Sequence, residues 1–287
     1  MISINTNYGG IFAAKASSQA TLRVDQAMER LSTGKRINHA RDDSAGQAIA
    51  TRLAAEIEGL AMASRNVADG QSLVDTAESA LVETHALLLR MREVSVQAAN
   101  GTLSTADNTA LNAEFQQLVA EIDRISDNTS WAGTKLLNGD STGAASTSAT
   151  FAFQAGVNNT TADTISVDIS NADAATLGVF VDNSGNNNIT LTDATNAGAA
   201  IVAVDAAIAA VSTERGKLGA VSNRMSSTMA NLDQITVNLT ASKGRIEDAD
   251  FAVETGNLAK GQILQQAATA MLAQANASKQ QVLTLIR

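Results

Sequence analysis

The feature that most constrains this chain is an apolar side chain at every seventh position over a long continuous segment. The series is Leu53, Leu60, Val67, Val74, Leu81 and Leu88, with Ala63, Gly70, Ala77, Met91 and Ala98 on the adjoining stripe. A seven-residue apolar repeat predicts an α-helix that buries one stripe against another helix. It predicts a single helix of roughly 55 residues, on the order of 80 Å long at about 1.5 Å per residue. Asp42, Asp43 and Ser44 provide an N-cap, and Gln47 follows Ser44 by three residues as in a capping box.

Two further segments carry the same kind of stripe and supply partners for this helix. The first is Leu111, Phe115, Leu118, Ile122 and Ile125, and the second is Ile201, Val204, Ile208, Val211, Leu218, Met225, Met229, Leu232 and Leu239. Gly101 ends the long helix, and Ser104 with Asp107 can begin the next one, so the chain doubles back. We therefore predict a mainly α fold, a long antiparallel helical bundle of coiled-coil type with a rod-like shape.

The two ends of the chain carry shorter stripes, which we predict to be contact surfaces for neighbouring chains. At the N-terminal end the stripe comprises Val24, Ala27 or Met28, and Leu31, and it stops at Gly34. Gly244 is expected to break the C-terminal side in the same way. The stripe beyond it is Leu264, Ala268, Met271, Ala275, Ser278, Val282 and Leu285, with a second face of Ile263, Ala267, Ala270, Ala273 and Ala277. A helix with two small-residue faces needs more than one neighbour, so we expect both ends to be disordered in the free subunit and to fold on assembly.

The centre of the chain has a different composition. Two alternating runs, 150–153 and 165–169, are separated by Gly156, Asn158 and Asn159 and predict a small β-hairpin. These patterns give three predicted parts. Residues 1–43 with 243–287 form paired terminal helices, 44–140 with 192–242 form the helical body, and 141–191 form a short β and loop insert.

Composition excludes several classes of function. The chain has no proline to break its helices and no cysteine for disulfides, thiolate metal sites or thiol nucleophiles. Its two histidines, His39 and His85, are too far apart to predict a metal site.

The net charge is −9, with +3 on the terminal segments and −12 on residues 44–242, so nucleic acid and anionic membranes are poor partners. No secretory signal is visible after Met1, and the most apolar window, 197–211, is judged too short to cross a bilayer. We predict no enzyme activity and no cofactor.

Several blocks at both ends of the chain resemble bacterial flagellins. Residues 31–46 read Leu-Ser-Thr-Gly-Lys-Arg-Ile-Asn-His-Ala-Arg-Asp-Asp-Ser-Ala-Gly, like the N-terminal signature of that family. Further agreement lies at 65–70, 133–139, 238–242, 245–252, 263–267 and 273–276. The resemblance covers nearly everything except about 140–195.

The resemblance implies a secreted, extracellular subunit that polymerises with itself into the flagellar filament, a helical propeller for motility. The paired terminal helices would form an inner tube inside a shell of the longer helices. It implies export through the flagellum's own channel without a cleaved signal. The implied partners are an export chaperone at the C-terminal segment, the filament cap and the hook-filament junction proteins. The alternative reading is a hook-filament junction protein, and an enzymatic insert would need a His-Glu-x-x-His motif, which the sequence lacks.

A more local resemblance lies in the long helix and the helix that follows it. In flagellins recognised by Toll-like receptor 5 this patch is the contact surface, and the matching residues here are Arg90, Glu93, Val94, Gln97 and Glu114. Val94 stands where Leu is usual, and Leu89 where Gln is usual. The plainer interpretation is that these charges solvate or pair on the surface of the bundle.

Overall fold

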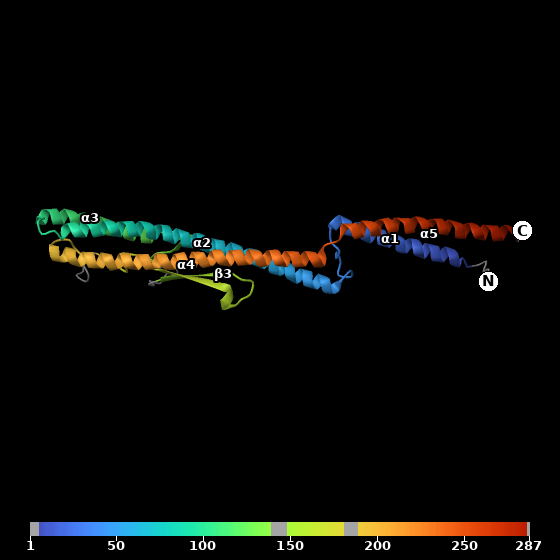
Figure 1. The fold of residues 1–287 in the computed structure, drawn as a ribbon, viewed down its shortest axis with the longest axis horizontal. Coiled ribbons are helices and arrows are strands. Elements are labelled where there is room, and N and C mark those ends of the chain that lie inside the picture. Colours follow the sequence, from blue (N-terminus) through green and yellow to red (C-terminus); the bar gives the residue numbers. More distant parts are fainter. Residues whose placement is uncertain (1–5, 139–147, 181–188, 286–287) are drawn as a thin grey trace. The chain divides into compact units, whose positions relative to one another are not determined.

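A computed structural model describes residues 6–138, 148–180 and 189–285, and of residues 279–285 it describes the backbone alone. These residues form five α-helices and two small antiparallel sheets (Figure 1). The fold is mainly α, as the apolar repeats predict. The chain divides into two compact units, Met1–Ile57 with Val237–Arg287 and Glu58–Thr236. We call them the terminal unit and the central unit and describe each by itself.

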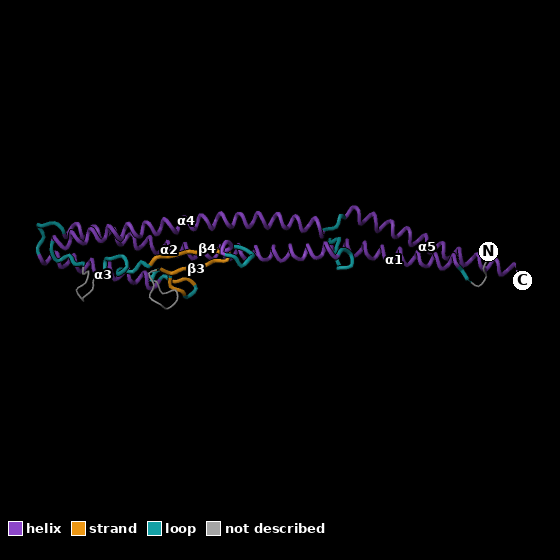
Figure 2. The backbone as a smooth tube through the Cα atoms, turned by 90° about the horizontal axis from the view of Figure 1, so that it is seen from below, coloured by secondary structure: helices purple, strands orange, loops and turns teal. Residues whose placement is uncertain are grey.

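The terminal unit is built on two antiparallel helices, α1 (Tyr8–Thr33) and α5 (Phe251–Leu285), which lie side by side (Figure 2). Helix α1 begins at Asn7, whose side chain accepts a hydrogen bond from the Gly10 N–H. It ends, as predicted, at Gly34, which has a φ of 72°. Glycine suits this left-handed C-cap because it lacks a Cβ.

The two connections that leave α1 and α5 are bonded to each other. The Ala249 N–H donates to the Gly34 carbonyl at 2.9 Å, and the Arg36 N–H donates to the Glu247 carbonyl at 2.6 Å. Lys35 forms an ion pair with Glu247 and an isolated β-bridge with Asp248. The prediction that Gly244 ends the preceding helix was wrong. That helix continues to Glu247, because the Gly244 carbonyl still accepts from the Asp248 N–H at 2.8 Å.

The central unit contains most of the three long helices, α2 (Ser44–Ala98), α3 (Thr105–Asn128) and α4 (Ala194–Glu247). Helices α2 and α4 run antiparallel, since Gln71 contacts Ser226, Glu78 contacts Arg215 and Arg92 contacts Asp205. The buried stripe of α2 includes the predicted series from Leu60 to Leu88, and the matching stripe of α4 is Ala197, Val204, Val211, Leu218, Met225 and Leu232. The heptad pattern therefore identified the core of this unit.

The helix starts are fixed by local side-chain hydrogen bonds. Asp43 caps α2, because its Oδ1 accepts from the Gly46 N–H at 2.8 Å, so the cap lies one residue before Ser44. At α3 the predicted pair forms a reciprocal capping box, in which Ser104 accepts from the Asp107 N–H and Asp107 accepts from the Ser104 N–H.

The predicted hairpin is present in the central unit. Strand β3 (Ser148–Gln154) pairs antiparallel with β4 (Thr164–Ser170), with Phe151 opposite Val167. Ile165, Val167 and Ile169 are buried while the residues between them are exposed, which is the alternation expected of a strand with one covered face. A two-residue pair, β1 (Ser130–Trp131) and β2 (Thr134–Lys135), closes the turn at Gly133.

Candidate functional site

Small residues form the contact between α1 and α5. The buried positions are Gly10, Ala13, Ala20 and Ala27 on α1, and Glu254, Gly261 and Ala268 on α5. A Cβ on Gly261 would lie 2.8 Å from Val24 Cγ2, closer than side chains tolerate, so the two helices approach closely there. Small residues let helix backbones come close together, but each buries little apolar area.

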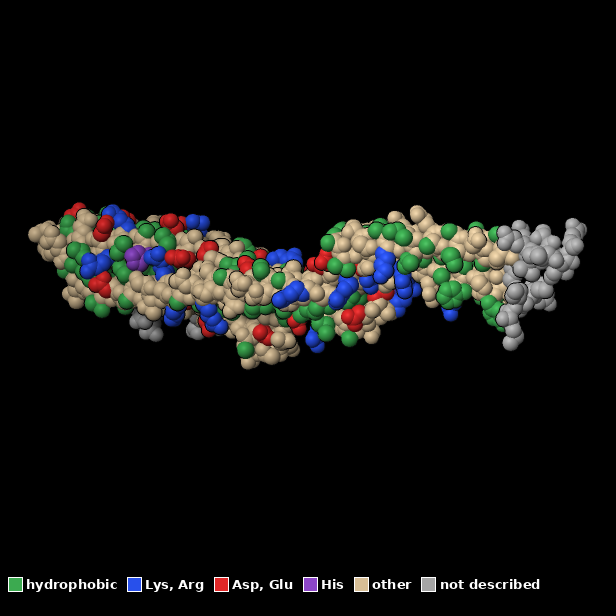
Figure 3. Space-filling view, turned by 45° about the vertical axis from the view of Figure 1, so that its right-hand side comes forward, with side chains coloured by type: hydrophobic (Ala, Val, Ile, Leu, Met, Phe, Trp, Pro, Cys, Tyr) green, Lys and Arg blue, Asp and Glu red, His purple; other side chains and the backbone are tan. Residues whose placement is uncertain are grey.

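The large apolar side chains of the same two helices face outward. Phe12 is 77% exposed and Tyr8 is 74% exposed, and Leu22, Ile263 and Met271 are each exposed by about two thirds. Figure 3 shows hydrophobic side chains spread over this helix pair, with basic side chains among them. Folded domains ordinarily bury such residues, and exposed apolar surface of this kind marks interaction sites. The terminal unit is thus arranged to bury its larger side chains against something outside itself.

The residues predicted from the terminal stripes are distributed over both kinds of surface. Ala27 is buried and Met28 is 56% exposed, which decides between the two alternatives for the intrachain contact. Val24, Leu31 and Ala275 are half-buried, and Ala268 is buried. Leu264 and Met271 are exposed. The side chains of Val282 and Leu285 lie outside the described residues.

Sequence reasoning missed the register of this intrachain contact. The predicted stripes included Ala27 and Ala268, which are buried, but they also included Leu264 and Met271, which are exposed, and they omitted Gly10, Ala13, Ala20 and Gly261. A signal was available, because Ala13, Ala20 and Ala27 recur at intervals of seven, as do Glu254, Gly261 and Ala268. Hydropathy ranks these small residues below their neighbours, so it does not single out this pattern.

A charged pair lies within the contact between α1 and α5. Arg30 Nη1 donates to Glu254 Oε1 at 2.7 Å, and Asn257 Nδ2 donates to Glu254 Oε2 at 2.8 Å. The Glu254 side chain is only 8% exposed. Burial works to raise the pKa of Glu254, but the hydrogen bonds from Asn257 and Arg30 outweigh it, so this pKa lies below its ordinary value.

Pairing of α1 with α5 should therefore weaken in acid. A carboxylate whose pKa is lower in the paired state than in the unpaired state stabilises pairing above its ordinary value, and this contribution is lost as the pH falls below that value. We expect the α1–α5 pair to lose helicity as the pH drops below about 4.5, the ordinary Glu value. Circular dichroism measured against pH tests this, with Glu254→Gln as the matched variant. That variant should be less stable at pH 7 and should show a shallower acid transition. An unchanged transition would contradict the assignment.

The second predicted patch lies in the central unit. Arg90 bridges Glu114 on α3 at 2.7 Å and Glu93 on its own helix at 3.0 Å, and all three side chains are exposed. Gln97 is also exposed. Val94 is only 1% exposed and packs in the core of the unit. Val94 is therefore not accessible for a direct contact with a receptor, while the other four residues are accessible.

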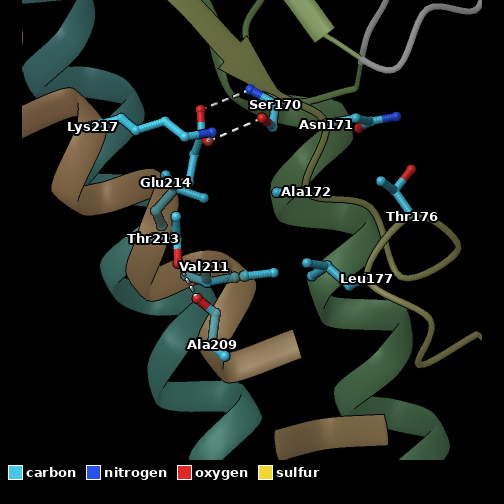
Figure 4. A pocket seen from close by; sticks show the side chains of 12 residues that line it. Ser170, Asn171, Ala172, Thr176, Leu177, Ala209, Val211, Thr213, Glu214 and Lys217 are labelled. Carbon is cyan, nitrogen blue, oxygen red and sulfur yellow. Dashed lines mark hydrogen bonds and ion pairs between the residues drawn. The ribbon is translucent and has the colours of Figure 1, made fainter. Parts of the chain in front are cut away.

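A cavity of about 420 Å³ lies between α4 and the segment that follows β4 (Figure 4). Its charged side chains are Glu214 and Lys217, which pair at 3.0 Å. Glu214 also accepts from the Ser170 N–H and the Ser170 hydroxyl, both at 2.9 Å. These bonds occupy both carboxylate oxygens, so the arrangement fixes the end of the hairpin on α4.

Among the residues that the structure describes, no group of three or more His, Asp and Glu side chains could hold a metal ion. His39 bonds Glu29 through Nε2 at 2.8 Å. Helix α4 contains an 18-residue stretch that could cross a membrane by length and composition, so the prediction that its apolar window is too short was wrong. Core helices pass the same test, and Val204, Val211 and Leu218 of α4 are buried in the central unit. Of the 18-residue stretch as a whole, 28% is buried.

Two protein-family models match this chain, one over its N-terminal helices and one over its C-terminal helices. The model of the bacterial flagellin N-terminal helical region matches residues 4–142, and that of the C-terminal helical region matches residues 201–286. A flagellin of Halalkalibacterium halodurans is 45% identical over 262 residues, which cover 91% of each chain. The chain belongs to the bacterial flagellin family. This flagellin is accordingly a structural subunit of the flagellar filament, an extracellular appendage.

Two further likenesses extend over most of this flagellin. The flagellin of Bacillus subtilis (strain 168) is 41% identical over 311 residues, covering 99% of both chains. A solved structure described as a flagellar hook-associated protein from Vibrio parahaemolyticus has a TM-score of 0.58 and covers 72% of this chain and 100% of its own. At 17% identity it shows the fold alone, and it gives no support to the hook-filament junction alternative.

Proposed function

We propose that this flagellin polymerises through the paired helices α1 and α5, whose exposed apolar faces contact different faces on neighbouring copies. The observation that carries the proposal is the inverted distribution of side chains, with alanine and glycine inside and Phe12, Ile263 and Met271 outside. A patch that binds a different patch on the next copy, with a rotation that does not close, produces an open helical fibre. Residues 1–43 and 243–287 would become rigid as this happens, because the pair alone buries little apolar surface.

Electron microscopy of the purified protein tests the proposal. Long filaments after seeding are the expected result. Short capped stubs or no polymer would favour the junction protein instead.

The wider assignment rests on family membership. The filament acts as a helical propeller, and the subunit reaches it through the flagellum's own export channel. An export chaperone would hold the C-terminal segment until export, and the filament cap and the hook-filament junction proteins would contact the growing polymer at its ends. What supports these partners is the likeness to flagellins over 91–99% of the chain.

Recognition by Toll-like receptor 5 would be a secondary property that belongs to the host. The support is the exposed cluster of Arg90, Glu93, Gln97 and Glu114, in which the two ion pairs of Arg90 hold a guanidinium at the surface of α2. Arginine is enriched among the residues that dominate protein interfaces.

Replacing Arg90 with alanine should reduce receptor stimulation by about tenfold, because a central arginine contact contributes more than about 1 kcal/mol. Filament formation should be unchanged. A receptor reporter assay with purified subunit measures the first effect and sedimentation the second. Arg124→Ala is the control, since Arg124 forms a similar exposed pair with Glu121 on α3. Undiminished stimulation by Arg90→Ala, or an equal loss in the control, would reject the contact.

A further inference from the structure

A polar pocket of about 390 Å³ opens on the helix pair of the terminal unit. Its charged side chains are Arg23 and Arg30 from α1, and Glu254 and Lys260 from α5. Gln26 and Asn257 add amide groups. The pocket therefore differs from the apolar faces around it, and it brings together three cations and one anion in a protein whose net charge is −9.

The charges in this pocket do not balance. Glu254 is already paired with Arg30 and bonded by Asn257. The side chains of Arg23 and Lys260 have neither an ion pair nor a hydrogen bond with any other residue that the structure describes. The Nε of Arg30 is buried and also lacks an acceptor within the described part of the chain. The pocket thus presents two uncompensated positive charges and unused donor capacity.

One carboxylate on the same helix pair has no cationic partner. Within their described side chains, α1 and α5 carry three acidic residues, Asp25, Glu29 and Glu254. Glu29 pairs with His39, and Glu254 pairs with Arg30. Asp25 is exposed and has no partner among the residues described. If helix pairs of neighbouring copies pack together, Asp25 loses water and needs a cation from another chain.

Asp25 cannot satisfy the pocket of its own chain. Residues two apart on an α-helix point about 200° apart, so Asp25 and Arg23 lie on opposite faces of α1. A binding patch and its complement on opposite faces of one helix are what a head-to-tail, non-closing polymer requires. If two identical chains faced each other with the same surface, the pocket would meet the pocket or Asp25 would meet Asp25, and neither would gain an opposite charge.

We propose that the pocket is a receptor for Asp25 of a second copy of this chain, whose carboxylate pairs with Arg23 and Lys260. This inference rests on the proposed assembly through α1 and α5, and it names the pair of charges that sets the register between copies. The apolar faces supply non-directional attraction, while charge complementarity selects one alignment and disfavours others.

A charge exchange tests the pairing. Asp25→Lys places a cation against the pocket, and Lys260→Asp places an anion opposite Asp25. Each single variant should therefore add to seeds of the same variant at least about tenfold more slowly than wild-type protein adds to wild-type seeds. The double variant should recover to within about threefold of the wild-type rate. The single defects should shrink in 1 M salt, where charges are screened over about 3 Å. Elongation is followed by light scattering at low salt, and circular dichroism checks that the helices are intact.

Lys15 provides the matched control. Like Lys260 it is an exposed lysine, but it lies on α1, outside the pocket, and its side chain has no partner within the described chain. Lys15→Asp should not rescue Asp25→Lys. A double variant no faster than the slower single variant, a single Asp25→Lys without a defect, or equal rescue by Lys15→Asp would each overturn the inference. If the wild-type protein itself fails to elongate, the proposed function fails; if it elongates and the exchange does not rescue, this pairing alone fails.

Discussion

A subunit that lacks Gln265–Arg287 is expected to remain monomeric and to form no filaments under conditions in which the full chain polymerises completely. The deletion removes Ala268 from the intrachain contact and the exposed Met271 from the outer face. It also removes the hydrogen bonds from Gln265 to Thr21 and from Asn7 to Asn276. With most of its partner helix gone, α1 has too little apolar contact to stay folded.

Sedimentation and electron microscopy measure this loss of assembly, and thermal unfolding measures what remains of the fold. The melting of the central unit should be unchanged, because its core lies within residues 58–236. Gln265→Ala is the control, since it removes one hydrogen bond and keeps the helix. Filaments grown from the shortened subunit would rule out polymerisation through α1 and α5.

Replacing Phe115 with alanine should destabilise the central unit by about 3–5 kcal/mol. Phe115 lies on α3, is 0% exposed and is among the largest side chains that are fully buried. Its removal leaves a cavity where α3 packs, and the surrounding helices relax only in part. Denaturant unfolding monitored by circular dichroism gives the change in free energy. Leu89→Ala, at a side chain that is 45% exposed, should cost less than about 1 kcal/mol. Similar losses for both variants would show that α3 is not anchored by Phe115.

The long helices of the central unit could be predicted closely from the sequence. Helix α2 has the 55 residues expected from its repeat, and the α3 cap at Ser104 and Asp107 is the one expected from its spacing. Both signals are local, since a heptad stripe and a capping box are each read from a few neighbouring positions. The hairpin was predictable for the same reason, because Ile165, Val167 and Ile169 alternate with polar residues.

Packing that depends on distant segments could not be predicted in this way. On α3 the predicted Phe115 and Ile122 are buried, but the predicted Leu118 and Ile125 are only half-buried, while Val119 and Ser126 are buried. The cause lies in later segments, since Ser126 donates to the Leu137 carbonyl at 2.7 Å and Asp123 accepts from the Ala174 N–H at 2.8 Å. These contacts place the following chain on a side of α3 that periodicity alone assigns to solvent.

The candidate assembly surface was predicted in location but not in detail. The terminal segments were identified because their stripes include two small-residue faces. Which side chains face inward depends on how closely two backbones approach, and Gly261 permits a close approach beside Val24. The small residues occupy the contact, and most of the larger side chains lie outside it.

The bonded connections beside Gly34 and Ala249 have a mechanical consequence for a subunit of a rotating filament. The backbone bonds between Gly34 and Ala249 and between Arg36 and Glu247 join the N-terminal and C-terminal strands where both leave the terminal helices. Tension applied to either helix should therefore be shared by the two antiparallel segments that these bonds join. Stretching one segment alone would require breaking its backbone hydrogen bonds to the other.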